Sequence, residues 1–293
     1  MTTSPHPRPV VVGVDASEAA LHAVAFAADE ARRRGAPLSL VHALTWPFGG
    51  FSDANASPEV QSLVRAAAEE VLGAAAGGAG GGVEVTASLA DGDPVHALRE
   101  AAATAQLLVV GSRGAGGVTG LLVGSTAAGV VGHVACPVVV LPDPAAAVVR
   151  PRRSVVVGVR GAPDDDEVLD FAFAAAAARG TDLVAVHAWQ DVVLETAYRS
   201  LSPLAEQAGV GGDAQRVLAE ALAGWRDKEP GVPVREVVVR DRPARALVAA
   251  GATAELLVVG QRRRRWPGPT THGVLHRATC PVAVVPLREE ADR

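Results

Sequence analysis

The sequence carries one long pattern twice. Residues 10–43 align without a gap with residues 155–188, at an offset of 145. Later in each half, QLLVVG ending at Gly111 matches ELLVVG ending at Gly260. A repeat of this length has the size of an ordinary domain, so the 293 residues are predicted to form two tandem domains, residues 1–149 and 150–293.

Within each repeat, short β-branched runs alternate with longer amphipathic stretches, which is typical of βαβ units. The strands predicted for the first repeat are residues 10–14, 38–43, 83–89, 107–110 and 138–141. The predicted helix starts are Ser17, Ser57, Asp93 and Ser125. Each repeat is therefore predicted to be an α/β sandwich built on a five-stranded parallel sheet, a Rossmann-like fold.

Periodicity also predicts which helix faces are buried. Apolar residues spaced i, i+3, i+4 and i+7 mark one face of each of the first two helices. They are Leu21, Val24, Ala25 and Ala28 in the first helix and Val60, Leu63, Val64, Ala67 and Val71 in the second. The glycine-rich residues 73–82 are expected to form a surface loop.

Composition restricts the classes of partner. The net charge of −5 gives no global positive field for nucleic acid or an anionic membrane. Lys228 is the single lysine, which excludes a phosphate-binding or Schiff-base lysine elsewhere in the chain. Residues 1–9 lack the apolar core of a signal peptide, and glycines with Pro137 interrupt the uncharged residues 114–142. We therefore expect a cytoplasmic protein that binds neither membrane nor nucleic acid.

Two predicted strands of the first repeat end in residues that packing and helix propensity do not require. Asp15 follows the first strand, and a glycine-rich segment beginning at Gly111 follows the fourth. Open parallel sheets bind ligands at the carboxyl ends of their strands, where the strand order reverses. Glycines let a backbone approach a ligand closely and expose its N–H groups. On the glycines alone, a phosphate cradle and a plain small-residue loop both remain open.

The spacing of that segment is more specific. Gly111-x2-Gly114-x9-Gly124-Ser125 follows the pattern G-x2-G-x9-G-[S/T]. Together with VGVDAS near the start and CPVVV near the end of the repeat, it resembles the universal stress protein family in its tandem form. The resemblance implies an α/β fold of the adenine nucleotide alpha-hydrolase type and a signalling or stress-response role.

In the ATP-binding branch of that family, the glycine loop holds the phosphates and ribose of ATP. The acidic residue after the first strand lies beside the nucleotide, and the second strand lines the adenine pocket. The resemblance thus implies ATP as the ligand, with Mg²⁺ as an optional ion. Carried over to this sequence, the nucleotide-binding residues are Gly13, Asp15, Val41, Gly111, Ser112, Arg113, Gly114, Gly117, Gly124, Ser125 and Thr126.

The resemblance also concerns assembly. In the family, the last strand of the domain commonly serves as a dimer interface. We therefore expect residues 138–141 and 282–285 to pair the two repeats within one chain. A homodimer of chains and an unidentified protein partner are further expectations.

The second repeat departs from the nucleotide pattern. Arg160 stands in place of Asp15, and the loop from Gly260 to Gly268 is five residues shorter than its counterpart. Pro269 replaces Ser125, which removes a hydroxyl group and a backbone donor. We therefore expect the phosphate site in the first repeat only.

Other candidates are weaker. His42 and His187 follow equivalent strands in separate domains, so structural or pocket-lining roles are expected. Cys136 and Cys280 each precede a proline before the last strand and are read as core. The three carboxylates at residues 164–166 fit the start of a helix better than a metal site.

Three functions remain open: an ATP-binding regulatory protein, an interaction module that binds no nucleotide, and an enzyme acting on ATP. The sequence lacks G-x4-G-K-[S/T], and the first repeat has no lysine, so Arg113 is the one cation of its glycine segment. We expect no enzyme, with slow ATP hydrolysis left open, and we favour the regulatory ATP-binding protein.

Overall fold

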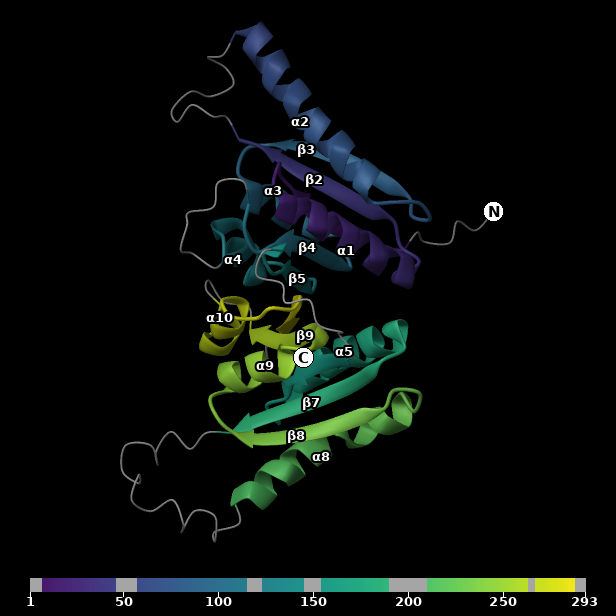
Figure 1. Cartoon of the computed structure of the whole chain (residues 1–293), viewed down its shortest axis with the longest axis vertical. Helices are drawn as coiled ribbons and strands as arrows, with labels where there is room; N and C mark the ends of the chain where they lie inside the picture. Colours follow the sequence, from purple (N-terminus) through teal and green to yellow (C-terminus); the bar gives the residue numbers. More distant parts are fainter. Residues whose placement is uncertain are drawn as a thin grey trace. The chain divides into compact units, whose positions relative to one another are not determined.

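The computed structural model describes residues 7–45, 57–114, 123–144, 154–189, 210–262 and 267–287. These residues divide into two compact units, one from each repeat. Each unit is an α/β domain with a parallel sheet, as the sequence predicts (Figure 1).

The first unit has the strand order β3-β2-β1-β4-β5, with all neighbouring strands parallel. Its strands are β1 Val10–Val14, β2 Leu38–Leu44, β3 Val85–Asp91, β4 Leu107–Gly111 and β5 Val138–Leu141. Its helices are α1 Glu18–Arg34, α2 Pro58–Gly78, α3 Pro94–Ala102 and α4 Ser125–Val131. Since β1 leads to β2 and β3 on one side and β4 leads to β5 on the other, the order reverses between β1 and β4.

The second unit repeats this topology in the order β8-β7-β6-β9-β10. Its strands are β6 Ser154–Gly158, β7 Asp182–Trp189, β8 Val234–Arg240, β9 Ala254–Arg262 and β10 Val282–Leu287. Its helices are η3 Pro163–Asp165, α5 Asp166–Arg179, α8 Val210–Lys228, α9 Pro243–Gly251 and α10 Pro269–Leu275.

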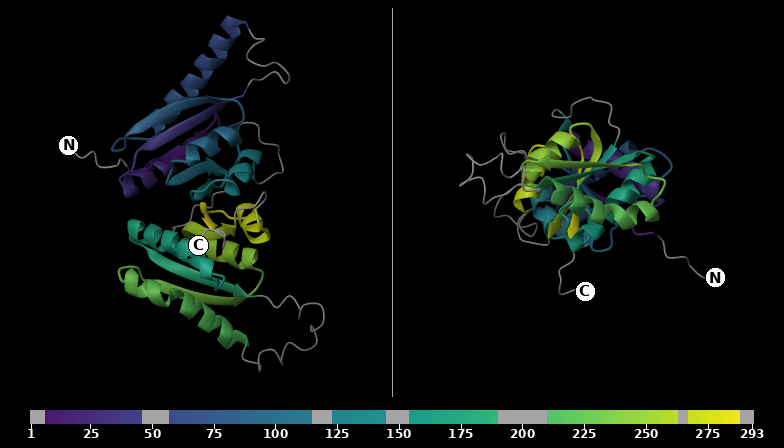
Figure 2. Two further views of the ribbon diagram at one scale, coloured as in Figure 1. Left: turned by 180° about the vertical axis from the view of Figure 1, so that it is seen from behind. Right: turned by 90° about the horizontal axis from the view of Figure 1, so that it is seen from below.

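Helices cover both faces of each sheet (Figure 2). In the first unit, α1 packs against α2, and α3 packs against α4. In the second unit, α9 packs against α10, α5 lies mainly on β6, β9 and β10, and α8 lies on β7 and β8. The sheet is thus buried between two helical layers, which explains why β1 and β5 read as continuous apolar runs.

Local capping fixes several helix starts. The Ser17 hydroxyl accepts a hydrogen bond from the Ala20 N–H at 3.1 Å, and Asp93 accepts one from the His96 N–H at 2.9 Å. Each cap satisfies a backbone donor that the first helical turn leaves without a partner. The predicted starts at Ser17 and Asp93 are confirmed because these contacts need only neighbouring residues.

The predicted buried faces of α1 and α2 are partly wrong. Val24 and Ala28 are buried, but Leu21 is 49% exposed and Ala25 is also exposed. The buried face of α1 instead consists largely of alanines, which allow the helix to lie close to the sheet. One helix can present two overlapping faces of the same period, and its position against the sheet selects between them.

The error is larger in α2. Its buried residues are Ala68, Leu72 and Ala75, whereas Leu63 is 71% exposed. The helix also continues to Gly78, through part of the stretch expected to be a loop. Burial of Ala75 holds this last part of the helix against the core, which offsets the low helix propensity of the glycines.

Candidate functional site

A cavity of about 690 Å³ lies in the first unit at the carboxyl ends of β1, β2 and β4. Its volume is within the roughly 300–1,000 Å³ of small-molecule sites. Ten of the eleven nucleotide-binding residues predicted from the sequence line it, and Gly117 lies outside the described residues. The ten are Gly13, Asp15, Val41, Gly111, Ser112, Arg113, Gly114, Gly124, Ser125 and Thr126.

The cavity combines an apolar part with a polar part. Val41, Leu98 and Val110 supply buried apolar side chains. His42 also lines it and donates a hydrogen bond from Nδ1 to the Val14 carbonyl at 2.7 Å. The imidazole therefore joins the ends of β1 and β2, which agrees with the structural or pocket-lining role expected for His42.

Asp15 lies between the turn that follows β1 and the segment that follows β4. Its Oδ1 accepts hydrogen bonds from the Ser17 N–H at 3.0 Å and the Ser17 hydroxyl at 2.5 Å, in the turn that leads into α1. Its Oδ2 faces Gly114, where a Cβ atom would overlap that oxygen and lie 3.5 Å from Asp15 Cγ. Only glycine fits at position 114 while Asp15 holds this position.

The other glycines of the motif also have local explanations. A Cβ atom on Gly111 would lie 3.1 Å from the Arg113 carbonyl oxygen, and one on Gly124 would lie 3.3 Å from the Ser112 carbonyl oxygen. The Gly124 N–H donates to that same Ser112 oxygen at 2.6 Å. The glycines therefore let the two ends of the segment approach each other, which sets the shape of this part of the cavity.

The structure explains why position 13 is a glycine, which the sequence alone does not. A Cβ atom there would lie 3.0 Å from Leu98 Cδ1 on α3. The corresponding Gly158 of the second unit has the same relation to Leu247 on α9, also at 3.0 Å. Both glycines thus make room for a helix, and this packing role accompanies the place of Gly13 in the cavity lining.

Arg113 has a partner that sequence analysis also missed. Its Nη2 lies 2.8 Å from Asp143 Oδ2. Its Nε is buried, with no hydrogen-bond partner in the described parts of the chain. The β4–β5 ladder ends at the pair Gly111 and Leu141, so extending it by two residues would place Arg113 opposite Asp143. The register of these two strands could therefore have indicated the Arg113–Asp143 pair.

The comparisons with known proteins agree with this architecture. The model of the universal stress protein family matches residues 7–142 and again residues 151–286. The chain belongs to the universal stress protein family. The tandem resemblance inferred from the sequence motifs is therefore confirmed.

Relatives of this universal stress protein match it over nearly their whole length. Universal stress protein Rv2005c from Mycobacterium tuberculosis is 36% identical, over 94% of this chain and 96% of its own. Universal stress protein Rv2623 from the same organism is 36% identical over 87% and 86%. The crystal structure of a universal stress protein from Archaeoglobus fulgidus has a TM-score of 0.69 at 21% identity, over 96% and 97% of the two chains, and supports the fold.

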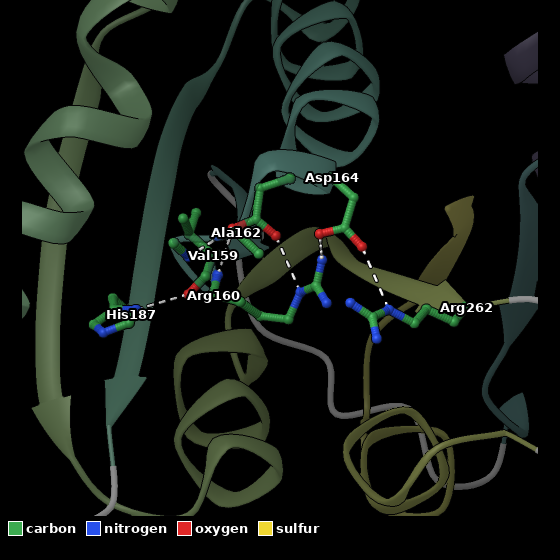
Figure 3. A network of polar contacts seen from close by, with 8 residues as sticks. Val159, Arg160, Ala162, Asp164, His187 and Arg262 are labelled. Carbon is green, nitrogen blue, oxygen red and sulfur yellow. Dashed lines mark hydrogen bonds and ion pairs between the residues drawn. The ribbon is translucent and has the colours of Figure 1, made fainter. Parts of the chain in front are cut away.

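The second universal stress protein domain is built differently at the same place. Figure 3 shows Asp164 between the guanidinium groups of Arg160 and Arg262. Asp164 Oδ1 lies 2.6 Å from Arg160 Nη2, and its Oδ2 lies 3.5 Å from Arg262 Nε. Arg160, which stands where the first domain has Asp15, is therefore held by this domain's own carboxylates.

A second carboxylate completes this arrangement. Asp165 Oδ2 accepts three consecutive backbone N–H groups, from Arg160 at 2.8 Å, Gly161 at 2.6 Å and Ala162 at 3.0 Å. Its Oδ1 accepts a hydrogen bond from Arg160 Nε at 3.1 Å. The carboxylates after β6 thus organise the helix start, as predicted, and Asp165 occupies the backbone donors there. His187 Nδ1 donates to the Val159 carbonyl at 2.9 Å, which repeats the contact of His42 (Figure 3).

A side chain of the second domain also occupies the backbone N–H at the start of α10. The buried Gln261 accepts a hydrogen bond on Oε1 from the Gly268 N–H at 3.0 Å. In the first domain, the equivalent Gly124 N–H is bonded by the Ser112 backbone carbonyl instead. The Gln261 side chain thus accepts, in the second domain, the hydrogen bond that a backbone carbonyl accepts in the first.

The remaining candidates lie apart from the cavity. Cys136 and Cys280 are buried and form no disulfide, as expected of core residues. Burial raises the pKa of the Cys136 thiol to about 11.

Within the described ranges, no group of three or more His, Cys, Asp or Glu side chains is placed to hold a metal ion. No helix there is long and apolar enough to cross a membrane.

Proposed function

We propose that the first domain binds ATP and that the chain acts as a regulatory, ATP-binding protein of the stress response. The convergence of ten motif residues, separated by up to 113 positions between Gly13 and Thr126, on one cavity carries the proposal. The cavity lies where the strand order reverses, which is where open parallel sheets take ligands.

The residues present fit such a ligand. Val41, Leu98 and Val110 offer an apolar surface suited to an adenine ring. On the polar side, the hydroxyl groups of Ser125 and Thr126 and the guanidinium of Arg113 are suited to phosphate. The buried Arg113 Nε, which has no hydrogen-bond partner in the described residues, supports a polar ligand at this side. Asp15 would contact the nucleotide or hold an accompanying Mg²⁺ ion.

We also propose that binding, and not turnover, is the activity. Fast phosphoryl transfer needs preorganised positive charge around the phosphates. Among the described lining residues, Arg113 alone carries a guanidinium or ammonium group, and Asp143 already pairs with it. Steady-state hydrolysis should stay below the rate of on the order of 1 per second that is usual for dedicated enzymes.

We further propose that β5 pairs with β10 within one chain and that two chains form a homodimer. We also propose that the chain has a protein partner, as yet unidentified, and acts in the cytoplasm. Hydrogen exchange followed on both strands of the intact chain tests the pairing, because a strand with two neighbours has backbone N–H groups protected on both edges. Fast exchange on alternate residues of both strands would contradict it.

Titration calorimetry of the full chain with ATP and Mg²⁺ tests the main proposal. We expect about one ATP per chain, because the second domain has Arg160, Gln261 and Pro269 where the first has Asp15, Ser112 and Ser125. Mass spectrometry of ligand released from the purified, denatured protein gives an independent test. A stoichiometry near two, or no binding of any adenine nucleotide, would contradict the proposal.

A further inference from the structure

We propose that Asp143 sets the charge selectivity of the first-domain site by balancing the charge of Arg113. The inference rests on the proposed nucleotide function and deepens it. Arg113 lines the cavity, and its Nη2 lies 2.8 Å from Asp143 Oδ2. A phosphate group that reaches Arg113 therefore meets a cation whose charge a carboxylate already offsets.

The backbone holds the two side chains in place. The Ser112 N–H donates to the Leu141 carbonyl at 2.7 Å, immediately past the last ladder pair of β4 and β5. The Arg113 and Asp143 side chains are 34% and 25% exposed. Partial burial lowers the local dielectric, so this pair interacts more strongly than a fully exposed one.

The second domain shows that the fold itself does not require this acid. There, Arg262 and Leu287 occupy the corresponding positions and pair in register between β9 and β10. Without an acid at position 287, Arg262 contacts Asp164 instead, at 3.5 Å. An arginine at this strand end is thus neutralised in both domains, but by acids from different places. Asp143 is therefore a particular feature of the first domain.

The charges have a direct consequence for ligands. Asp143 places a negative charge beside the cation that a phosphate group would contact. Free ATP, which carries about four negative charges, is repelled by this carboxylate more strongly than ATP whose charge Mg²⁺ partly offsets. An uncharged ligand such as adenosine does not experience this opposition. Asp143 should therefore penalise free ATP, penalise Mg²⁺-bound ATP less, and leave adenosine unaffected.

Calorimetric titrations of the full chain with ATP, ATP plus Mg²⁺, and adenosine test this. Asp143→Asn keeps the shape of the side chain and removes its charge. We expect it to raise the affinity for free ATP by about threefold to tenfold, with a smaller gain for Mg²⁺-bound ATP and none for adenosine. The matched control is Asp29→Asn, which removes the same charge from the exposed pair with Arg32 on α1 and should change no affinity by more than about twofold.

A second pair of variants tests whether the effect passes through Arg113. Arg113→Gln should weaken ATP binding, and adding Asp143→Asn to it should then bring a smaller gain than in the wild-type background, because only the direct repulsion between Asp143 and the phosphates is left to remove. Thermal unfolding of each variant verifies that the fold is retained. A gain of full size without Arg113, an equal gain for adenosine, or no gain at all would overturn the proposed role of Asp143. If the wild-type chain binds neither ATP nor adenosine, the proposed function fails, and this inference fails with it.

Discussion

Gly114 and Asp15 lie so close together that a Cβ atom on Gly114 would overlap Asp15 Oδ2 and lie 3.5 Å from Asp15 Cγ. Both residues line the first-domain cavity. The absence of a side chain at one position therefore permits the placement of the carboxylate at the other. This relationship gives the glycine motif a physical basis that its spacing alone does not supply.

Gly114→Ala should weaken ATP binding by about tenfold, equivalent to roughly 1.4 kcal/mol, because the added methyl group displaces the Asp15 carboxylate. Asp15→Ala should weaken binding as well, and Gly114→Ala should cost little more in that background because the clash is gone. Titration calorimetry on the two single variants and the double variant measures this coupling.

Gly73→Ala is the control for glycine replacement. It lies in α2, and a Cβ atom there would meet nothing within 4 Å. ATP affinity should not change, and stability should rise by about 0.5–1 kcal/mol. Wild-type affinity in the Asp15→Ala, Gly114→Ala double variant would show that these two residues do not belong to a nucleotide site.

Asp165→Ala should destabilise the second domain by about 2–5 kcal/mol, because three backbone N–H groups and Arg160 lose their shared acceptor. Urea unfolding measures the loss. Asp166→Ala is the matched control: Asp166 is exposed and accepts one long hydrogen bond, 3.4 Å from Trp225 Nε1. Similar losses in both variants would refute the central place of Asp165, and ATP binding by the first domain should survive both.

Leu72→Ala should lower the free energy of unfolding by about 2–4 kcal/mol, since Leu72 is 6% exposed in the face of α2 that packs on the core. Leu63→Ala in the same helix should cost less than about 0.5 kcal/mol, because Leu63 is 71% exposed. The two variants make the same chemical change in one helix. A larger loss for Leu63→Ala would show that the helix face predicted from periodicity is the buried one.

The Cys136 thiol should resist alkylation at pH 8 until the protein is unfolded, because burial raises its pKa to about 11 and the thiolate is the reactive form. Desolvation is the main cause of that shift. The unfolded chain has an ordinary thiol pKa near 9, so it loses its proton first as the pH rises. The protonated, buried thiol therefore stabilises the folded state fully below about pH 9, and this stabilisation is lost as the pH rises toward 11.

The loss should amount to at most about 3 kcal/mol, and Cys136→Ala should remove this part of the pH dependence. The free energy of unfolding of both proteins, measured between pH 8 and 11, tests the sign of this dependence. Rapid labelling of Cys136 in the native protein would contradict the burial argument.

The sequence by itself determined the tandem α/β architecture, the family and several element bounds. The predicted strands 10–14 and 138–141 coincide with β1 and β5, because a strand buried on both faces needs apolar residues at every position. The caps at Ser17 and Asp93 depend on residues within three positions. Ten of the predicted site residues could be placed near one another because the carboxyl ends of neighbouring parallel strands meet at one edge of a sheet.

Only the tertiary structure decided which helix faces are buried and which residues accompany the motif. Leu21 and Leu63 follow the helical period as well as their buried neighbours do, and the position of each helix on the sheet leaves them exposed. Gly13 is explained by Leu98, 85 positions away, and Arg113 is held by Asp143, 30 positions away. Such contacts depend on packing and strand register between distant segments, and no local pattern in the sequence encodes either.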